Sequence, residues 1–216
     1  MEWLYALGLG YLLGSIPFGL ILTKLFGVGD IRNIGSGNIG ATNVLRTGRK
    51  GLAAATLLLD GAKGYLAVWL AGLLWSGSNS PLYFWVWAGF GALLGHCFPV
   101  WLRFRGGKGV ATMLGASFAF DWRIGLASAA TWLLATLISR ISSVGGMSSA
   151  IATPIAAFAL SEAVSSGDNM AARAQGLVLF GVAAFLMPMA MLVVFQHRAN
   201  IKRLIAGTEP KIGQKG

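Results

Sequence analysis

Residues 110–138, VATMLGASFAFDWRIGLASAATWLLATLI, decide how many times this chain can cross a membrane. The triplet Asp121-Trp122-Arg123 divides the stretch into apolar pieces of 11 and 15 residues. As helices these pieces would be roughly 16 and 22 Å long, whereas a full span needs about 30 Å. The stretch is therefore one long helix, a re-entrant hairpin or two short helices.

The composition of the whole chain places these pieces in a membrane protein. Of the 216 residues, 56% are hydrophobic, 31 are glycine and only 11% are charged. Because a soluble domain carries about 25% charged residues, this composition excludes a soluble enzyme, a disordered chain and a coiled coil. We expect a single integral membrane domain over residues 1–216 with an all-α fold.

The distribution of basic residues selects among the three possibilities. Five other runs are long enough to span: Trp3–Phe26, Leu52–Trp75, Leu82–Leu102, Val144–Val164 and Ala174–Phe195. One long helix over residues 110–138 would move the basic tail outside, and a re-entrant hairpin would bury the charges of Asp121 and Arg123. We predict seven transmembrane helices, the fourth and fifth short, with the N-terminus outside and the C-terminus cytoplasmic.

This topology gives a strong positive-inside bias and accounts for much of the net charge of +10. Only Arg123 and Arg173 lie on outer loops. The inner loops and the tail carry Arg32, Arg46, Arg49, Lys50, Arg103, Arg105, Lys108, Arg140, Arg198, Lys202, Arg203, Lys211 and Lys215.

The first inner loop, residues 29–46, has the composition of a phosphate-binding loop. Glycines such as Gly35 and Gly37 allow the backbone to turn its N–H groups toward one point. Arg46 offers a planar fork that suits a phosphate. A plain linker would not need neutral polar side chains at the density found here, which are Ser36, Asn38, Thr42 and Asn43.

The second inner loop and the tail add further candidates. Gly106, Gly107 and Gly109 surround Lys108 just before an expected helix start, where backbone amides favour anions. A positive-inside anchor would explain Arg103 and Arg105 but not these glycines. The other candidates are Ser143 in the third inner loop and, in a tail expected to continue the last helix into water, His197, Asn200 and Glu209.

No metal site or cofactor is expected. Cys97 is the single cysteine, and the two histidines, His96 and His197, are far apart in sequence, which makes a weak metal argument. Asp60 and Lys63 lie one turn apart within the second run. They are either a functional pair or a self-neutralising one, and the role of His96 is equally open.

The inner loops together resemble the three signature motifs of the bacterial acyl-phosphate:glycerol-3-phosphate acyltransferases. The stretches concerned are residues 35–46, GSGNIGATNVLR, residues 106–112, GGKGVAT, and residues 197–204, HRANIKRL, followed by Gly207 and Glu209. Residues 14–19, GSIPFG, and 95–99, GHCFP, are also similar to family segments. The His-x4-Asp signature of thioester-using acyltransferases is absent, since Trp101 and Lys202 stand five residues after the histidines.

The resemblance implies an inner-membrane enzyme with its active site on the cytoplasmic face. It would move an acyl group from acyl phosphate to the 1-hydroxyl of sn-glycerol 3-phosphate, giving lysophosphatidic acid and phosphate, the first acylation of phospholipid synthesis. The expected partners are these two substrates, the lipid bilayer and, through functional coupling, the enzyme that makes acyl phosphate. No nucleic acid is expected.

The same resemblance suggests roles for the candidates. The donor phosphoryl group would be held by Ser36, Asn38, Thr42, Gly107 and Lys108, and glycerol 3-phosphate by Arg46, Lys108, His197 and Asn200. The general base is either His197 or the substrate's own phosphate. A mixed anhydride is already activated, so positioning and charge stabilisation suffice without a covalent intermediate.

Two other functions are alternatives to acyl transfer, and each needs a feature that the sequence should show. A secondary transporter of phosphorylated solutes would need polar residues at mid-membrane in several helices, and only Asp60 and Lys63 approach that. A membrane-anchored nucleic-acid or nucleotide binder would need a module outside the membrane, and no inner loop is long enough to fold one.

Overall fold

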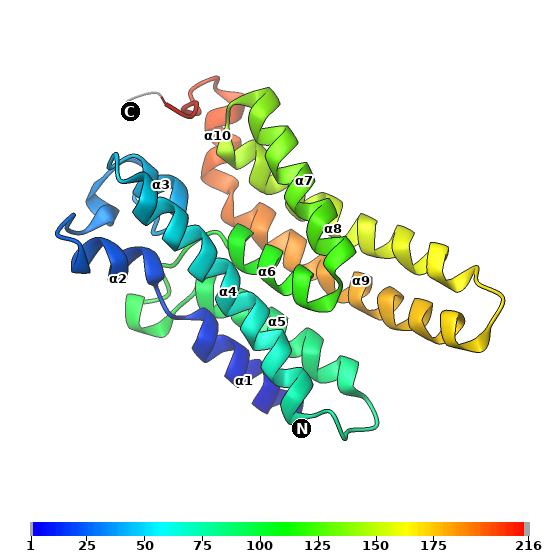
Figure 1. Ribbon diagram of the computed structural model, residues 1–216. Coiled ribbons are helices and arrows are strands. Elements are labelled where there is room, and N and C mark those ends of the chain that lie inside the picture. The colour runs from blue at the N-terminus through cyan, green and yellow to red at the C-terminus, as the bar shows by residue number, and fades with distance from the viewer. Residues whose placement is uncertain (1, 214–216) are drawn as a thin grey trace.

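The computed structural model describes residues 2–213, and this part of the chain is helical without any β-strand, as predicted (Figure 1). The elements are α1 Trp3–Gly14, α2 Phe18–Leu25, η1 Ile31–Asn33, α3 Ala41–Leu45, α4 Lys50–Leu74, α5 Pro81–Cys97, η2 Val100–Leu102, α6 Val110–Phe120, α7 Trp122–Ser139, α8 Ser142–Ser165, α9 Met170–Gln196 and α10 Arg198–Ile205.

Six segments among the described residues are long and apolar enough to cross a membrane. They are Trp3–Leu25, Lys50–Leu74, Pro81–Leu102, Trp122–Ser139, Ser142–Ser165 and Met170–Gln196. The remaining apolar helix, α6, has 11 residues and is short, as expected. The count of seven spans depends on α6 as the seventh and, like the orientation of the two ends, stays a prediction.

The fifth predicted helix is longer than the 15-residue apolar run that predicted it, because only Asp121 separates it from α6. Helix α7 has 18 residues and starts at Trp122, directly after Asp121. The Asp121 carboxylate accepts a hydrogen bond from the backbone N–H of Arg123 at 2.8 Å, so it caps the first turn of α7. The same carboxylate forms an ion pair with the Arg123 guanidinium.

Helix α6 lies in the middle of the bundle (Figure 1). It contacts α4 and α5 from the first half of the chain and α7, α8 and α9 from the second. Its approach to α4 is close, since a β-carbon on Gly115 would overlap the carbonyl oxygen of Gly61. The short helix therefore joins the two halves of the bundle, and its first residues lie at their junction.

The first span differs from the continuous helix that its apolar run predicted. It breaks between α1 and α2 at Ser15-Ile16-Pro17, where Pro17 has no backbone N–H to donate. A break within a span leaves carbonyl groups that need donors from neighbouring helices. Lys63 Nζ of α4 donates to the Ile16 carbonyl at 2.8 Å, and the Trp101 indole donates to the Ser15 carbonyl at 2.8 Å.

Lys63 is also one half of a buried ion pair. Its Nζ lies 2.7 Å from Oδ1 of Asp60, and both side chains are almost fully buried. The imidazole Nδ1 of His96, at the end of α5, lies 3.7 Å from the same oxygen. The geometry therefore favours the self-neutralising pair, with an added role in capping the broken first span.

We predict that Lys63→Met destabilises the fold far more than the same change at exposed Lys24 of α2. It removes the cap on Ile16 and leaves the buried Asp60 carboxylate unpaired, which costs about 3–5 kcal/mol of unfolding free energy. Adding Asp60→Asn should recover part of this loss. The check is unfolding of each variant in mixed detergent micelles, and equal costs at Lys63 and Lys24 would contradict the capping role.

Candidate active site

The first inner loop is organised from within by Asn43. Its Nδ2 donates to the carbonyl groups of Ile31 and Ile34 at 2.8 and 3.0 Å, and its Oδ1 accepts from the backbone N–H of Ser36 at 3.1 Å. Beside it, Gly35 has φ of +54°, a left-handed conformation that glycine adopts without strain. Asn43, expected to bind substrate, therefore acts first by positioning Ser36.

The second inner loop is pinned to the end of α5. The backbone N–H groups of Gly106 and Gly107 donate to the carbonyls of Cys97 and His96 at 3.0 and 2.9 Å. These two amides are thus not directed at a substrate, which corrects the expectation that the loop binds anions through them. A β-carbon on Gly107 would overlap Nε2 of His96, so this position requires glycine.

The tail does not continue the last helix, contrary to the sequence expectation. Helix α9 ends at Gln196 and α10 begins at Arg198, with a break at His197. The break turns α10 so that His197 and Asn200 are both buried. Gln196 donates to the carbonyl oxygen of Gly107 at 3.2 Å, which ties the second loop to the end of α9.

A chain of hydrogen bonds connects the second loop, the tail and the third inner loop. Lys108 Nζ donates to Oδ1 of Asn200, whose Nδ2 donates to Glu209. The Ser143 hydroxyl donates to the same carboxylate at 2.7 Å, and Arg203 Nε donates to it at 2.7 Å. Glu209 therefore positions its neighbours. Burial alone would raise the pKa of Glu209, but the hydrogen bonds from Ser143, Asn200 and Arg203 together outweigh burial and lower it.

Lys108 carries its charge in an unfavourable environment. Burial lowers the pKa of its ammonium group to about 8, with Arg203 and Arg46 contributing and Glu209 opposing. Lys108, Arg203 and Arg46 are three cations near a single carboxylate, that of Glu209, so positive charge is in excess. This arrangement favours binding of an anion, which would restore the balance.

His197 is held as a neutral imidazole. Its Nδ1 lies 2.7 Å from the carbonyl oxygen of Val193, and because a carbonyl can only accept, Nδ1 carries the proton. Nε2 is then the acceptor. Burial lowers the pKa of His197 to about 4, and Lys108 adds to that effect. The Val193 carbonyl, rather than Glu209, orients this ring.

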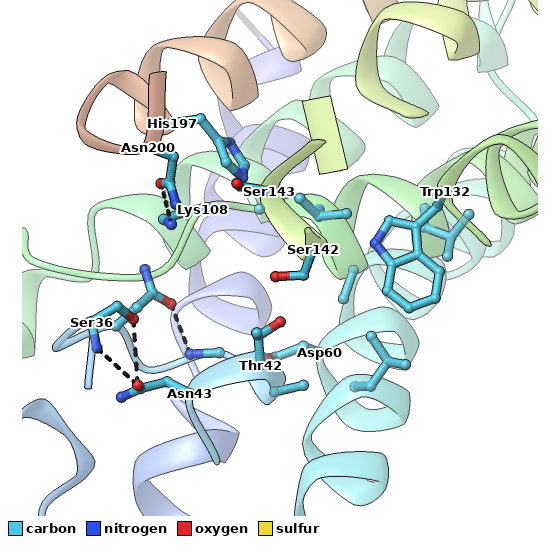
Figure 2. Close-up of a pocket in the computed structure, with 18 of the residues that line it drawn as sticks. Ser36, Thr42, Asn43, Asp60, Lys108, Trp132, Ser142, Ser143, His197 and Asn200 are labelled. Atoms are coloured by element: carbon cyan, nitrogen blue, oxygen red, sulfur yellow. Dashed lines mark hydrogen bonds between the residues drawn. The ribbon is translucent and has the colours of Figure 1, made fainter. Parts of the chain in front are cut away.

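These segments surround one cavity of about 350 Å³ (Figure 2), which we call the chamber. Its polar part holds Ser36, Thr42, Lys108 and His197. Its other part is apolar and comes from α4, α6 and α7, with Leu57, Leu114, Trp132 and Leu133. Leu133 is half exposed on the outer surface of the bundle. The chamber therefore joins a polar, positively charged part to an apolar part that reaches the outer surface of the bundle.

Most candidates from the sequence meet in the chamber, and a few glycines do not. The residues that line it are Ser36, Asn38, Thr42, Asn43, Arg46, Lys108, Gly109, Ser143, His197, Asn200 and Glu209. Gly35 and Gly107 are not among the residues that line it, and Gly37 and Gly106 line a neighbouring cavity.

Sequence motifs gave no indication of the apolar part of the chamber. Trp132 lies inside a uniform apolar run, so only its packing against the chamber distinguishes it. Asp60 and His96 also line the chamber. Across residues 2–213, no three side chains of the types that bind metals gather in one place, and metal-free chemistry stays a prediction.

Comparison with known proteins identifies a family of matching sequences. Residues 4–207 match the family described as "Glycerol-3-phosphate acyltransferase". Relatives of that name share 49% identity in Erythrobacter litoralis, over 96% of this chain and 93% of the relative, and 53% in Mesorhizobium japonicum, over 98% and 96%.

Two solved structures have a similar fold. They are crystal structures of PlsY (YgiH), an integral membrane glycerol 3-phosphate acyltransferase, in its glycerol 3-phosphate and lysophosphatidic acid forms. The TM-scores are 0.81 and 0.79 at 33% and 32% identity, over 99% of this chain and 96% of that chain in both cases.

We predict that Gly107→Ala lowers activity by about tenfold or more, because the new methyl group forces the Lys108 loop away from His96. Gly51→Ala is the matched control, since a β-carbon there meets no atom within 4 Å. The measurement is the rate of acyl transfer by both purified variants. Equal rates would show that the packing of Gly107 on His96 does not position Lys108.

Proposed function

The chain belongs to the glycerol-3-phosphate acyltransferase family, and from this premise we propose that its acyl donor is acyl phosphate. The protein is an integral membrane acyltransferase that acts on glycerol 3-phosphate. The proposed reaction gives lysophosphatidic acid and inorganic phosphate. One observation carries the proposal: the chamber combines excess positive charge with an apolar part open toward lipid.

The residues divide between the two substrates by position. Ser36, Thr42 and Asn38, from the first inner loop, are proposed to hold the phosphoryl group of the donor, with the first turn of α6 opposite them. Arg46 and Lys108 are proposed to hold the phosphate of glycerol 3-phosphate, with Asn200 and His197 beside it. The acyl chain would lie along Leu57, Leu114, Trp132 and Leu133.

The chemical step needs no enzyme nucleophile. The 1-hydroxyl oxygen of glycerol 3-phosphate attacks the acyl carbonyl carbon, the carbon–oxygen bond to phosphate breaks, and phosphate leaves with the electron pair. Lys108 and the hydroxyl groups of the first loop stabilise the negative charge that develops. Among the described residues, no serine or cysteine is hydrogen-bonded to His197, which is consistent with direct transfer.

The proton from the hydroxyl group is proposed to go to a phosphate oxygen. The pKa of His197 is about 4, whereas the second pKa of a phosphate monoester is about 6, so phosphate is the stronger base. His197 then acts through Nε2 as a hydrogen-bond acceptor that orients the attacking hydroxyl group. Its neutral form and fixed tautomer suit this role.

The location of the reaction follows from the predicted topology. The chamber is built from the loops that the positive-inside rule places at the cytoplasmic face of the inner membrane. Glycerol 3-phosphate would enter from the cytoplasm, and the donor would come from the enzyme that makes acyl phosphate. This places the enzyme at the first acylation of phospholipid synthesis.

The test of the donor uses protein purified in detergent, with acyl phosphate and glycerol 3-phosphate but no thioester and a chelator present. We expect lysophosphatidic acid to form, and Lys108→Ala or Arg46→Ala to lower the rate by about 10²-fold or more. Arg49→Ala, an exposed arginine outside the chamber, is the control for lost charge. Product formed from a thioester alone would refute the proposed donor.

The pKa of Lys108 predicts how the rate depends on pH. Lys108 must be protonated to bind phosphate, so kcat/KM for glycerol 3-phosphate should fall as the pH rises through about 8. Lys108→Arg keeps a charge at every pH in this range. It should therefore lose the alkaline decline, even at a lower maximal rate. If kcat/KM of Lys108→Arg still declined at alkaline pH, the decline would come from a titratable group other than Lys108.

A further inference from the structure

A second cavity lies beside the chamber and is not used by the mechanism above. It has a volume of about 630 Å³ and shares Ser36 and Asn38 with the chamber, so the two cavities are neighbours. Three arginines, Arg32, Arg103 and Arg105, contribute to its walls. None of its lining residues is acidic, and the cavity is strongly cationic.

The backbone that presents two of these arginines is strained. Arg103 and Phe104 have φ of +52° and +60°, a left-handed conformation that side chains other than glycine rarely adopt. Glycine is abundant in this chain, with 31 copies, yet it is not used at either position. These left-handed residues end η2 and turn the chain, and Arg103 and Arg105 on this turn both line the cavity.

Hydrogen bonds hold this turn in place. The backbone N–H of Phe104 donates to the Pro99 carbonyl at 3.0 Å, and that of Arg105 donates to the Leu102 carbonyl at 3.1 Å. The Trp101 indole fixes the start of the turn to Ser15 at 2.8 Å. The backbone of this wall is therefore fixed, which lowers the part of the entropic cost of binding that comes from ordering the chain.

The charges in this cavity are only partly balanced. Asp30 pairs with Arg32 and holds its guanidinium through Nε, at 2.9 and 3.0 Å from the two carboxylate oxygens. Arg103 and Arg105 form no ion pair with any carboxylate of the described residues. Both arginines are exposed, and two guanidinium groups that line one cavity without a paired carboxylate match a phosphate group.

We infer that the second cavity binds inorganic phosphate and is the route by which this product leaves the chamber. The inference rests on the proposed donor, whose phosphoryl group becomes free phosphate next to Ser36 and Asn38. These two residues line both cavities, so phosphate released beside them would lie next to the arginines and away from the apolar part. Lysophosphatidic acid leaves on the other side, toward lipid.

The first experiment measures binding of inorganic phosphate to the purified protein by calorimetry, with saturating glycerol 3-phosphate and no donor. We expect Arg103→Ala/Arg105→Ala to weaken phosphate binding by about tenfold or more, since two charge-assisted hydrogen-bond partners are lost. Arg49→Ala/Lys50→Ala removes the same charge from an exposed site outside both cavities, and it should stay within about twofold of the parent. Unchanged glycerol 3-phosphate binding verifies that both double variants are folded.

Two outcomes would overturn the inference. Phosphate binding that is lost in Lys108→Ala but kept in the double arginine variant would place the ion in the chamber. A phospholipid headgroup offers the same chemistry as free phosphate, so the titration is repeated in micelles with phosphatidylglycerol or phosphatidylcholine. Phosphate binding abolished by phosphatidylglycerol alone would assign the cavity to lipid.

The second experiment tests the exit role during turnover. Inhibition by added phosphate should weaken by about tenfold in Arg103→Ala/Arg105→Ala and remain unchanged in Arg49→Ala/Lys50→Ala. Equal inhibition constants in the two double variants would contradict the exit role. The calorimetry needs no donor, so a failure of acyl phosphate as substrate would be recognised separately from a failure of the phosphate site.

Discussion

The site depends on a partly buried lysine at the point where three distant parts of the chain meet. Lys108 belongs to the second inner loop, Asn200 accepts its hydrogen bond from the tail, and Glu209 links that pair to Ser143. Burial makes the charge of Lys108 costly, and nearby Arg46 and Arg203 raise the cost. These three cations outnumber the one carboxylate among them, and this imbalance supports the proposal that phosphate-bearing substrates bind here.

The membrane imposes the rest of the design. Helix α6 has 11 residues and extends roughly 16 Å, about half of a hydrocarbon layer, and irregular backbone precedes it where the chain enters the bundle. Irregular backbone at such a place has to be satisfied by protein. The carbonyls of His96 and Cys97 accept from this loop, and Lys63 and Trp101 serve the broken first span in the same way. Loop amides and side chains thus satisfy the backbone carbonyls at the end of α5 and at the break in the first span.

Sequence patterns predicted the helical class and most of the chamber, because glycine, lysine and arginine in short inner loops have few structural explanations. They did not predict the breaks at Pro17 and His197, since apolar periodicity continues across both positions. They also assigned Gly106 and Gly107 to anion binding, whereas the packing of these residues against α5 is a tertiary contact. Trp132 was missed because an apolar residue in an apolar run carries no local signal.

The most direct test of the central claim is a structure of this protein with glycerol 3-phosphate bound. The account predicts that the phosphate group lies within hydrogen-bonding distance of Lys108 and Arg46. The free 1-hydroxyl should point toward the apolar part of the chamber near Trp132. Glycerol 3-phosphate found between Arg103 and Arg105, with no phosphate beside Lys108, would contradict it.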